Sequence, residues 1–211
     1  MIAVVLHSGG LDSTLCLLMA KEAGRNVVSL GIDYGQRHRI ELEYALAQCL
    51  RYGIERRVLR VDWDKPVRNI PTGRSLEEIR SGISPAFLPA RNAVFLTLAC
   101  AEATGIDAGE VWIGVNAIDF SGYPDCRPEF IDSFRTMINA AVPGGPQVVA
   151  PLIEMSKPSI AAEARRLGVA PGDTWSCYQP RFTQQGVSPC GQCDACILHD
   201  HAWQEANRKE S

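Results

Sequence analysis

The sequence lacks the features that mark several classes of protein. No apolar run approaches the roughly 20 residues that cross a bilayer, so we expect no membrane partner. The 21 basic and 24 acidic residues leave a net charge of −3, which offers nucleic acid no basic surface. The apolar N-terminus lacks both a basic segment and a small-residue cleavage site, and it predicts a strand instead of a signal peptide. We therefore expect a cytoplasmic protein with no nucleic-acid partner.

Two fingerprints of nucleotide binding, GxxxxGK[ST] and GxGxxG, are also absent, as are internal repeats and low-complexity tracts. What is present is an ordinary globular composition. Of the 211 residues, 46% are hydrophobic and 21% are charged. This length and composition suit one domain with a small appendage.

Apolar runs alternate with helical patterns along most of the chain. Strands are predicted at 2–7, 27–33, 57–61, 111–115 and 147–150, and helices at 13–23, 39–52, 91–104, 128–141, 158–167 and about 197–207. In the helix 39–52 we expect the inward side chains to be Leu42, Ala45, Leu46, Cys49 and Leu50. This alternation predicts an α/β fold, a parallel sheet flanked by helices.

Two segments interrupt the alternation. Residues 62–89 hold several Gly, Pro and Ser residues, and we expect a loop or a lid beside the active site. Residues 175–196 hold four of the eight cysteines. We accordingly divide the chain into a larger domain, 1–170, and a cysteine-containing segment with a C-terminal helix, 171–211.

The clustered cysteines are Cys177, Cys190, Cys193 and Cys196. CxxC spacing in a reducing compartment favours a metal over disulfides. Four thiolates satisfy tetrahedral Zn²⁺ and leave no open position, so we predict a structural zinc site. An iron–sulfur cluster and metal-free thiols are the alternatives, and His199 or His201 is an alternative fourth ligand to Cys177.

A glycine-rich stretch, HSGGLDST, follows the first predicted strand and covers residues 7–14. Ligands of open α/β sheets bind beyond the carboxyl ends of the strands. Glycines let backbone N–H groups approach an anion, the next helix contributes its N-terminal dipole, and Ser8, Ser13 and Thr14 add hydroxyl donors. The stretch predicts a phosphate-binding loop, against the plainer interpretation of a turn with a helix cap at Asp12 or Ser13.

Asp33 ends the second predicted strand and is followed by Arg37 and His38. The ribose or base of a nucleotide would lie at this strand end, although Asp33 would also serve as a helix cap. Arg91 and Asn92 begin a helix near the same edge. Either arginine, Arg37 or Arg91, would pair with phosphate or a carboxylate, or would form an ordinary ion pair.

SGGLDS resembles the signature SGGxDS of the PP-loop ATP pyrophosphatases, which cleave ATP between its α and β phosphates. Further motifs narrow the resemblance: DYGQRH (33–38), PARN (89–92), GVNAIDFSGYPDCRPEF (114–130), WSCY (175–178) and CGQCDAC (190–196). Together the motifs resemble 7-cyano-7-deazaguanine synthase, the QueC family. The motifs span nearly the whole chain, and the resemblance implies a Rossmann-like PP-loop fold with a small C-terminal zinc-binding segment.

The resemblance also implies a reaction and its participants. The family converts 7-carboxy-7-deazaguanine, ammonia and ATP into 7-cyano-7-deazaguanine (preQ0), a precursor of queuosine, and so acts as an ATP-dependent carbon–nitrogen ligase. Adenylation makes one carboxylate oxygen a good leaving group, ammonia gives the amide, and a second activation gives the nitrile. By resemblance we expect Mg²⁺ on the ATP phosphates and a homodimer.

The family's residues carry over onto matching positions of this sequence. The expected ATP-binding residues are His7, Ser8, Gly9, Gly10, Leu11, Asp12, Ser13, Thr14, Asp33 and Arg37. Among the residues expected to act in catalysis are Ser8, Asp12, Ser13, Arg91 and Lys157. Lys157 resembles a lysine that PP-loop enzymes direct at phosphates, and it is also a plausible solvated residue at a helix start.

The loop after the strand 111–115 should hold the deazaguanine. A carboxylate matches the donors of a guanine-like base, which makes Asp119, Asp125 and Glu129 candidates; we expect at least one of them to cap the helix at Pro128. Other expected substrate contacts are Arg91, Asn92, Phe120 or Tyr123 stacking on the ring, and Arg127 receiving the carboxylate. Cys126, in the same block, is a weaker candidate nucleophile.

Two features depart from the family pattern. The segment between Cys177 and Cys190 is long, and ILHDHAW after the last cysteine lacks a basic segment. An alternative is therefore a QueC-like ligase of antiviral defence that attaches the activated deazaguanine to a protein amine. A tRNA thiolase is disfavoured by the missing basic patch, and a non-enzymatic zinc-binding module by the intact SGGLDS loop.

Overall fold

The computed structural model describes residues 1–36, 39–63, 70–116, 123–184 and 186–208. Asp119, Phe120, Arg37 and His38, named above as site candidates, lie outside these residues.

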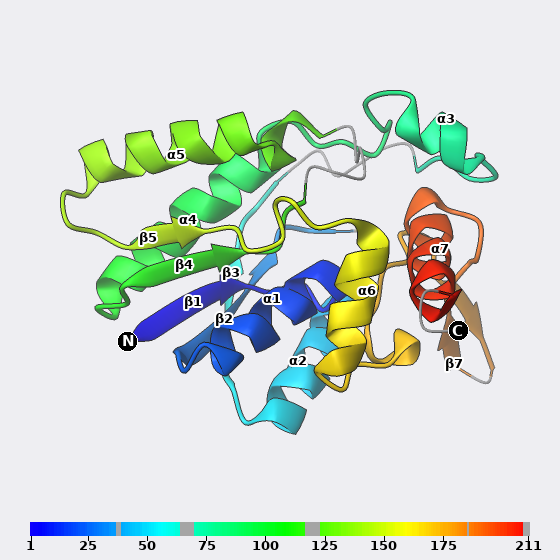
Figure 1. Cartoon of the computed structure of the whole chain (residues 1–211), viewed down its shortest axis with the longest axis horizontal. Helices are drawn as coiled ribbons and strands as arrows, with labels where there is room; N and C mark the ends of the chain where they lie inside the picture. Colours follow the sequence, from blue (N-terminus) through cyan, green and yellow to red (C-terminus); the bar gives the residue numbers. More distant parts are fainter. Residues whose placement is uncertain (37–38, 64–69, 117–122, 185, 209–211) are drawn as a thin grey trace.

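A five-stranded sheet forms the centre of the fold (Figure 1). Its strands are β1 (Ile2–Leu6), β2 (Asn26–Asp33), β3 (Glu55–Arg60), β4 (Glu110–Ile113) and β5 (Gln147–Val149). They lie in the order β3-β2-β1-β4-β5, and every neighbouring pair is parallel. The chain fills one side of β1 with β2 and β3 and then returns to fill the other side. The predicted parallel sheet is confirmed.

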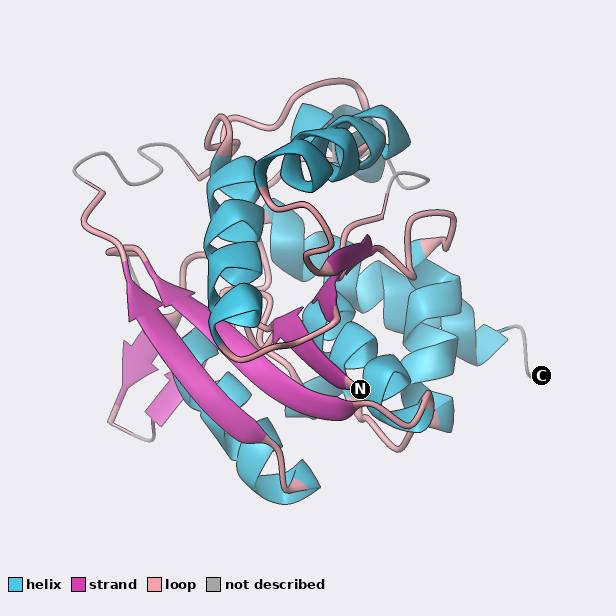
Figure 2. Ribbon diagram, turned by 90° about the vertical axis from the view of Figure 1, so that its left-hand side faces the viewer, coloured by secondary structure: helices cyan, strands magenta, loops and turns pink. Residues whose placement is uncertain are grey.

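Helices cover both faces of the sheet (Figures 1 and 2). One face packs against α1 (Leu11–Glu22) and α6 (Lys157–Arg166), and α7 (Asp194–Arg208) packs on α6. The other face packs against α4 (Arg91–Gly105) and α5 (Pro128–Ala141). The helix α2 (Ile40–Tyr52) contacts the edge strand β3 and its neighbour β2.

Strand β1 shows why the apolar run IAVVL is continuous. Ala3 and Val5 belong to the apolar cluster on the α1 side, whereas Val4 belongs to the cluster on the α4 side. All three side chains are fully buried. Successive side chains of a strand point to opposite faces, so a strand covered on both faces must be apolar at every position.

Helix α2 corrects one expectation. Ala45 and Cys49 are buried as expected, but Leu46 and Leu50 are 50% and 77% exposed. The helix lies over the edge of the sheet and buries a narrow stripe that includes Ala45, Cys49 and the polar Gln48. Leu46 and Leu50 lie outside this stripe, because residues three and four apart, such as 45, 48 and 49, share a helix face that positions 46 and 50 do not.

The segment predicted as a loop or lid contains a short helix in its described part, α3 (Leu76–Arg80). A capping box begins it: the Ser75 hydroxyl accepts from the Glu78 N–H, and the Glu78 carboxylate accepts from the Ser75 N–H. The long segment between Cys177 and Cys190 contains a two-stranded antiparallel hairpin, β6 (Arg181–Thr183) and β7 (Gly186–Ser188). Neither α3 nor the hairpin was predicted.

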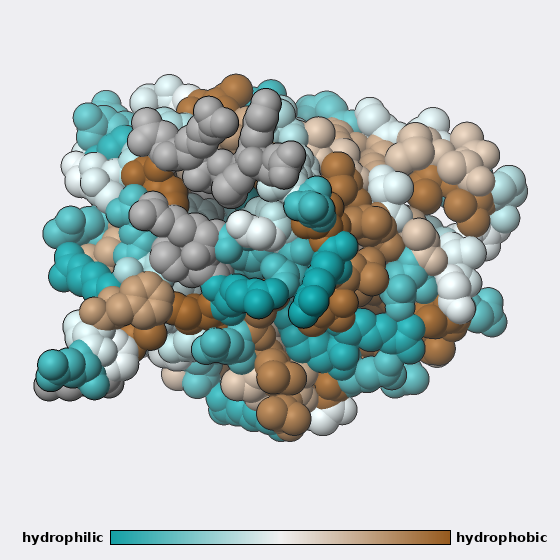
Figure 3. Space-filling view, turned by 180° about the vertical axis from the view of Figure 1, so that it is seen from behind, coloured by the Kyte–Doolittle hydropathy of each residue, from teal (hydrophilic) through white to brown (hydrophobic). Residues whose placement is uncertain are grey.

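The outer surface mixes apolar and hydrophilic side chains, as the face in Figure 3 shows. Leu50 and Phe182 are among the large apolar side chains left most exposed. No helix within the described residues is both long and apolar enough to cross a membrane.

Candidate active site

A cavity opens at the carboxyl ends of β1 and β4, where the chain order of the sheet reverses. Loops that leave neighbouring strands in opposite directions part at such a point, which is where open α/β sheets bind ligands. The cavity has a volume of about 410 Å³, within the range of small-molecule sites. Gly114, at the end of β4, permits this arrangement: a Cβ there would lie 2.8 Å from the Asp12 carbonyl oxygen of α1.

The glycine-rich loop forms one wall of the cavity. Gly9 has φ +90°, and a Cβ at this position would lie 2.4 Å from the Glu41 carbonyl oxygen of α2. Gly10 is the N-cap of α1 and has no side chain that could occupy the helix N-terminus. The backbone donors of the first turn therefore remain available to an anion.

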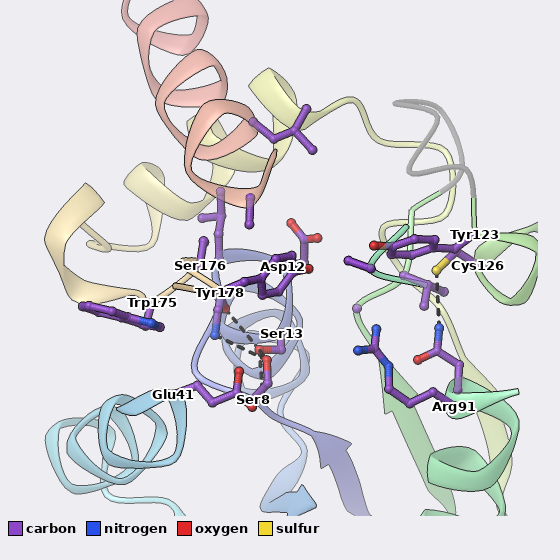
Figure 4. Close-up of a pocket in the computed structure, with 18 of the residues that line it drawn as sticks. Ser8, Asp12, Ser13, Glu41, Arg91, Tyr123, Cys126, Trp175, Ser176 and Tyr178 are labelled. Carbon is purple, nitrogen blue, oxygen red and sulfur yellow. Dashed lines mark hydrogen bonds between the residues drawn. The ribbon is translucent and has the colours of Figure 1, made fainter. Parts of the chain in front are cut away.

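Two hydroxyl groups lie at the mouth of this loop. The Oγ atoms of Ser8 and Ser13 share a hydrogen bond of 3.1 Å, and Ser13 Oγ also donates to the Gly10 carbonyl at 3.1 Å (Figure 4). Both residues line the cavity. Hydroxyl groups at this position can donate hydrogen bonds to an anion in the cavity. Thr14 is buried below, where its hydroxyl donates to the Gly10 carbonyl at 2.8 Å.

A buried polar network supports the loop from below. His7 Nε2 donates to Gln48 Oε1 at 2.8 Å, and His7 Nδ1 accepts from Ser29 Oγ at 2.9 Å. Gln48 Nε2 donates to the Gly9 carbonyl at 3.3 Å and to the Asp173 carbonyl at 2.6 Å. Burial, reinforced by the positive charge of Arg56, lowers the pKa of His7 to about 3, so His7 stays neutral. His7 contributes to the cavity wall, and its ring nitrogens are engaged in this network.

Asp12 and Lys157 form an ion pair at the cavity wall, joining α1 to α6. Asn116, from the loop after β4, donates to Asp12 Oδ2 at 3.5 Å. Two oxygen acceptors remain: Asp12 Oδ1 and Asn116 Oδ1 are buried without a hydrogen-bond donor among the described residues. Buried acceptors without a donor are uncommon and indicate a missing cation or solvent molecule.

Arg91 begins α4 and lies across the cavity from the serines (Figure 4). The phenol groups of Tyr34, Tyr178 and Tyr123 lie close enough to its guanidinium to act on its charge. Burial acts against this charge, but the phenol groups raise the pKa of Arg91 overall. The site therefore holds a permanent cation opposite the glycine-rich loop.

Asn92 and Asp125 form a clasp beside Arg91. The Asn92 N–H donates to Asp125 Oδ2 at 3.1 Å, and Asn92 Nδ2 donates to the Asp125 carbonyl at 3.1 Å and to Cys126 Sγ at 3.4 Å. Asp125 thus caps the N-terminus of α4. We had expected at least one of the three acids to cap the helix that begins at Pro128, and Asp125 does not. The N-cap of α5 is Arg127, and no described side chain caps it, because the turn at 124–126 directs Asp125 toward α4.

Of the other residues expected in the site, some line the cavity and others do not. Leu11 and Tyr123 line the cavity, and the Tyr123 ring stacks on Phe87 with centroids 5.3 Å apart. Arg127 and Glu129 are exposed and are not among the lining residues. Asp33 is buried at the end of β2, where Arg39 forms an ion pair with it.

Several lining residues were not predicted: Tyr34, Glu41, Asn116, Trp175 and Tyr178. Four of them lie within the motifs DYGQRH, GVNAIDF and WSCY, so membership of these motifs could have identified them as site residues. Glu41 had none, because an acidic residue in the first turn of a helix is ordinary.

The four clustered cysteines converge. Their Sγ atoms all lie within 4.8 Å of one another, and all four side chains are buried. Backbone N–H groups of Gln179 and Cys190 donate to Cys177 Sγ at 3.3 and 3.2 Å. Sulfur atoms bound to one tetrahedral metal at about 2.3 Å lie about 3.8 Å apart, and Cys190 and Cys196 are separated by 3.9 Å. The cluster is therefore a possible metal site.

The cysteine cluster is joined to the cavity wall. Thr72 forms a β-bridge with Cys193, and the Gly73 N–H donates to the Gln192 carbonyl at 2.9 Å. Arg74 pairs with Asp194, whose side chain is buried. The segment that follows supplies Ile79, Ser84 and Ala86 to the cavity lining.

Comparison with known proteins gives consistent matches. The family model "Queuosine biosynthesis protein QueC" matches residues 2–207. The chain is 56% identical over 202 residues to "7-cyano-7-deazaguanine synthase 2" of Rhodopseudomonas palustris (strain HaA2), covering 96% of each chain. It is 44% identical over 217 residues to the 7-cyano-7-deazaguanine synthase of Myxococcus xanthus, covering 97% of this chain and 93% of that one.

A solved structure shares the fold. The U34-tRNA thiolase NcsA of Methanococcus maripaludis, solved with its [4Fe–4S] cluster, aligns with a TM-score of 0.51 at 15% identity. The alignment covers 99% of this chain and 66% of the thiolase. At this identity the likeness extends to the fold alone.

Proposed function

The chain belongs to the QueC family of queuosine biosynthesis proteins, and we propose that it is a 7-cyano-7-deazaguanine synthase. It would convert 7-carboxy-7-deazaguanine, ammonia and ATP into 7-cyano-7-deazaguanine as an ATP-dependent carbon–nitrogen ligase. The observation that carries the proposal is the near full-length match at 56% identity to a chain of that name. The cavity supports it, since a glycine-rich loop suited to phosphate and the half-buried Arg91 face each other there.

The first chemical step is activation of a carboxylate. A carboxylate oxygen of the substrate attacks the α phosphorus of ATP, and pyrophosphate leaves. The backbone donors of α1 and the hydroxyls of Ser8 and Ser13 would hold the departing phosphates, and Lys157, paired with Asp12, would neutralise developing charge. These groups are fixed before the reaction, so little reorganisation opposes it.

Mg²⁺ would bind beside these phosphates. Asp12 Oδ1 and Asn116 Oδ1 are buried oxygen acceptors with no donor in the described part of the chain. Carboxylate and amide oxygens are ligands that Mg²⁺ accepts, together with substrate phosphates. The ion would supply charge neutralisation on the phosphate groups.

The substrate would lie on the Arg91 side of the cavity. Arg91 is a suitable partner for a carboxylate, because its fork of donors matches two oxygens. The stacked rings of Tyr123 and Phe87 would provide an aromatic surface for the base. Asp119, Phe120 and Arg37 remain predictions from the family resemblance, as do contacts from Asn92, Asp125, Arg127 and Glu129.

The metal of the cysteine cluster would be Zn²⁺. Four buried thiols with sulfur separations close to a tetrahedral edge fit it, and four protein ligands leave no position for catalysis. The zinc would hold the segment 171–211 together. We also propose a homodimer, from the family resemblance, and a cytoplasmic location and the division at residue 170, from the sequence pattern.

The alternative activity, transfer of the deazaguanine to a protein amine, is not favoured. The relatives at 56% and 44% identity both bear the name of the small-molecule synthase.

Mass spectrometry of the reaction products tests the proposal. Purified protein is incubated with ATP, Mg²⁺, ammonium and 7-carboxy-7-deazaguanine, and the nitrile and AMP are expected. A Ser8→Ala/Ser13→Ala variant should lose most of the AMP formation, whereas Ser133→Ala, on the exposed side of α5, should retain it. AMP with only the adenylate or amide would point to the protein-modifying alternative, and no ATP cleavage would refute the assignment.

A further inference from the structure

Two acidic residues that line the cavity take no part in the steps above, Asp194, which pairs with Arg74, and Glu41. Glu41 lies in the first turn of α2 and lines the cavity. Gln36 Nε2 donates to Glu41 Oε1 at 3.1 Å. Figure 4 shows Glu41 on the side of Ser8 and the phosphate-binding loop, with Arg91 on the other side. Its backbone contacts the loop directly, since the Glu41 carbonyl is the atom that a Cβ at Gly9 would meet.

An acid at this position is at odds with the anionic substrates. ATP and a carboxylate both carry negative charge, and a carboxylate repels each of them. A carboxylate in such a cavity can bind a cation or accept a proton. Ammonium is the cation that this reaction consumes, and Gln36 fixes the carboxylate from one side while leaving oxygen acceptors for it.

The surroundings match the needs of an ammonium site. Trp175, Tyr34 and Tyr178 line the same cavity, and aromatic faces attract ammonium groups. Tyr34 and Tyr178 lie close enough to Glu41 for its charge to act on the pKa of their phenol groups. A carboxylate bordered by aromatic rings attracts a small cation such as ammonium, and it repels the phosphate groups of ATP.

The reaction also requires a base at this place. At neutral pH ammonia in water is mostly ammonium, which has no lone pair and cannot attack. We propose that Glu41 binds this ammonium ion in the cavity and accepts a proton from it, delivering ammonia to the adenylated carboxyl group. This role deepens the proposed function and rests on it.

The atoms balance as follows. An ammonium N–H bond breaks, and its proton moves to a Glu41 carboxylate oxygen. The freed lone pair forms the C–N bond at the carbonyl carbon of the adenylate, the C–O bond to the phosphate breaks, and AMP leaves with that electron pair. The nitrogen releases its surplus proton to the departing phosphate, which leaves the amide. Glu41 then returns its proton to water.

The acid strength of Glu41 supports this role. Burial raises the pKa of Glu41 to about 7, against the opposing charges of Arg91 on α4 and Arg56 on β3 and the hydrogen bond from Gln36. A general base works best when its pKa lies near the working pH. The same burial lowers the pKa of a bound ammonium ion, as it does for a buried lysine, which eases the transfer.

The test compares two nucleophiles in Glu41→Gln. Hydroxylamine is already a neutral amine at neutral pH and needs no base, whereas ammonium does. We expect the variant to keep carboxylate-dependent ATP–pyrophosphate exchange and hydroxamate formation within about threefold of the wild type. Its kcat/KM for ammonium should fall by about 100-fold or more, the usual contribution of a positioned base. Glu43→Gln, the same change at an exposed position of α2, should match the wild type.

The pH dependence gives a second readout. In the wild type, kcat/KM for total ammonium should rise to a plateau as a group with pKa about 7 loses its proton. In Glu41→Gln it should instead follow the concentration of free ammonia and keep rising into alkaline solution.

The outcomes separate the two proposals. Equal losses with ammonium and hydroxylamine, or an altered Mg²⁺ requirement for exchange, would overturn the role of Glu41. A wild type that shows no carboxylate-dependent exchange would instead refute the proposed function itself.

Discussion

At the scale of single residues, two ionisable groups lie beside the glycine-rich loop, the buried His7 and the half-buried Glu41, and their pKa values are shifted in opposite directions. Burial lowers the pKa of His7 to about 3 and raises that of Glu41 to about 7. Both shifts have the same cause, because burial disfavours the charged form of either group. At neutral pH the site therefore holds a neutral imidazole below the loop and a carboxyl group poised between its two forms beside it.

These shifts predict a pH dependence of stability. Between pH 3 and 6.5 the unfolded chain binds a proton at His7 that the folded chain rejects, so His7 makes stability fall as the pH falls. Between pH 4.5 and 7 the folded chain binds a proton at Glu41 that the unfolded chain rejects, so Glu41 makes stability fall as the pH rises. The two effects oppose each other where they overlap.

Removing one effect should reveal the other. From pH 6.5 to about pH 5, Glu41→Gln should lose about 2 kcal/mol more unfolding free energy than the wild type, at about 1.4 kcal/mol per pKa unit. Urea denaturation at both pH values measures it. Glu43→Gln should follow the wild type, and parallel profiles for Glu41→Gln and wild type would contradict the prediction.

Gly9 allows the loop to approach α2. Gly9→Ala would place a Cβ 2.4 Å from the Glu41 carbonyl oxygen with φ at +90°, and we expect a loss of more than about 3 kcal/mol. Gly144→Ala is the matched control, since Gly144 has φ +74° but no atom within 4 Å of its added Cβ. That variant should lose only about 1–2 kcal/mol from backbone strain. Equal losses by chemical denaturation would show that packing against α2 is unimportant.

At the scale of secondary-structure elements, α2 provides both structural support and a lining residue. Gln48 donates hydrogen bonds to the Gly9 and Asp173 carbonyls. Glu41, in the first turn of the same helix, lines the cavity. The inward stripe of this helix is therefore partly polar. The apolar pattern of the sequence therefore did not identify the inward face, and Leu46 and Leu50, which were expected to be buried, are exposed.

The segment before α3 is fastened to α7 by one ion pair. Arg74 Nε donates to Asp194 Oδ1 at 3.0 Å, and Arg74 Nη2 pairs with Oδ2. Arg74→Met would leave the buried Asp194 carboxylate unpaired, and we expect a loss of about 2–4 kcal/mol. Because the segment lines the cavity, KM for the deazaguanine should rise as well.

Two further variants check the origin of this loss. Arg208→Met removes an exposed ion pair with Glu205 on the same helix, and it should change stability by less than about 1 kcal/mol. Arg74→Met combined with Asp194→Asn should regain a substantial part of the loss. A double variant as unstable as Arg74→Met alone would argue against an unpaired charge as the cause.

At the scale of the whole molecule, the cysteine cluster connects regions far apart in sequence. It lies in one apolar cluster with Ile40 of α2 and Trp175, and its neighbours hold residues 72–74. A metal there would stabilise the cavity wall in addition to the C-terminal segment, since metal binding adds directly to folding free energy.

Removing the metal should therefore affect the whole fold. We expect one zinc per chain by elemental analysis, and a chelator should lower the unfolding temperature by more than about 10 °C, since each kcal/mol corresponds to roughly 2–4 °C at this size. Cys193→Ser should lose the zinc, whereas Cys100→Ser, an equally buried thiol outside the cluster, should keep it. Iron with visible absorbance would indicate an iron–sulfur cluster instead.

Much of this protein follows from the sequence by itself. The sheet, its flanking helices, the position of the glycine-rich loop after β1 and the four converging cysteines were all predicted. Each depends on local information: the period of apolar residues along a strand or helix, or a motif whose members lie within a few residues. Ser8 and Ser13 meet across five residues of one loop, so their spacing alone indicates their proximity.

The tertiary structure alone decided which distant residues share the cavity. Glu41, Asn116 and Tyr178 come from three different segments, and the strand order β3-β2-β1-β4-β5 brings those segments to one edge of the sheet. It likewise directed Asp125 to α4 and left Arg127 and Glu129 exposed. Side-chain periodicity specifies which face of an element is buried, but not which element packs against it. That choice depends on the combined packing of all the elements, and it determines the environment that perturbs His7 and Glu41.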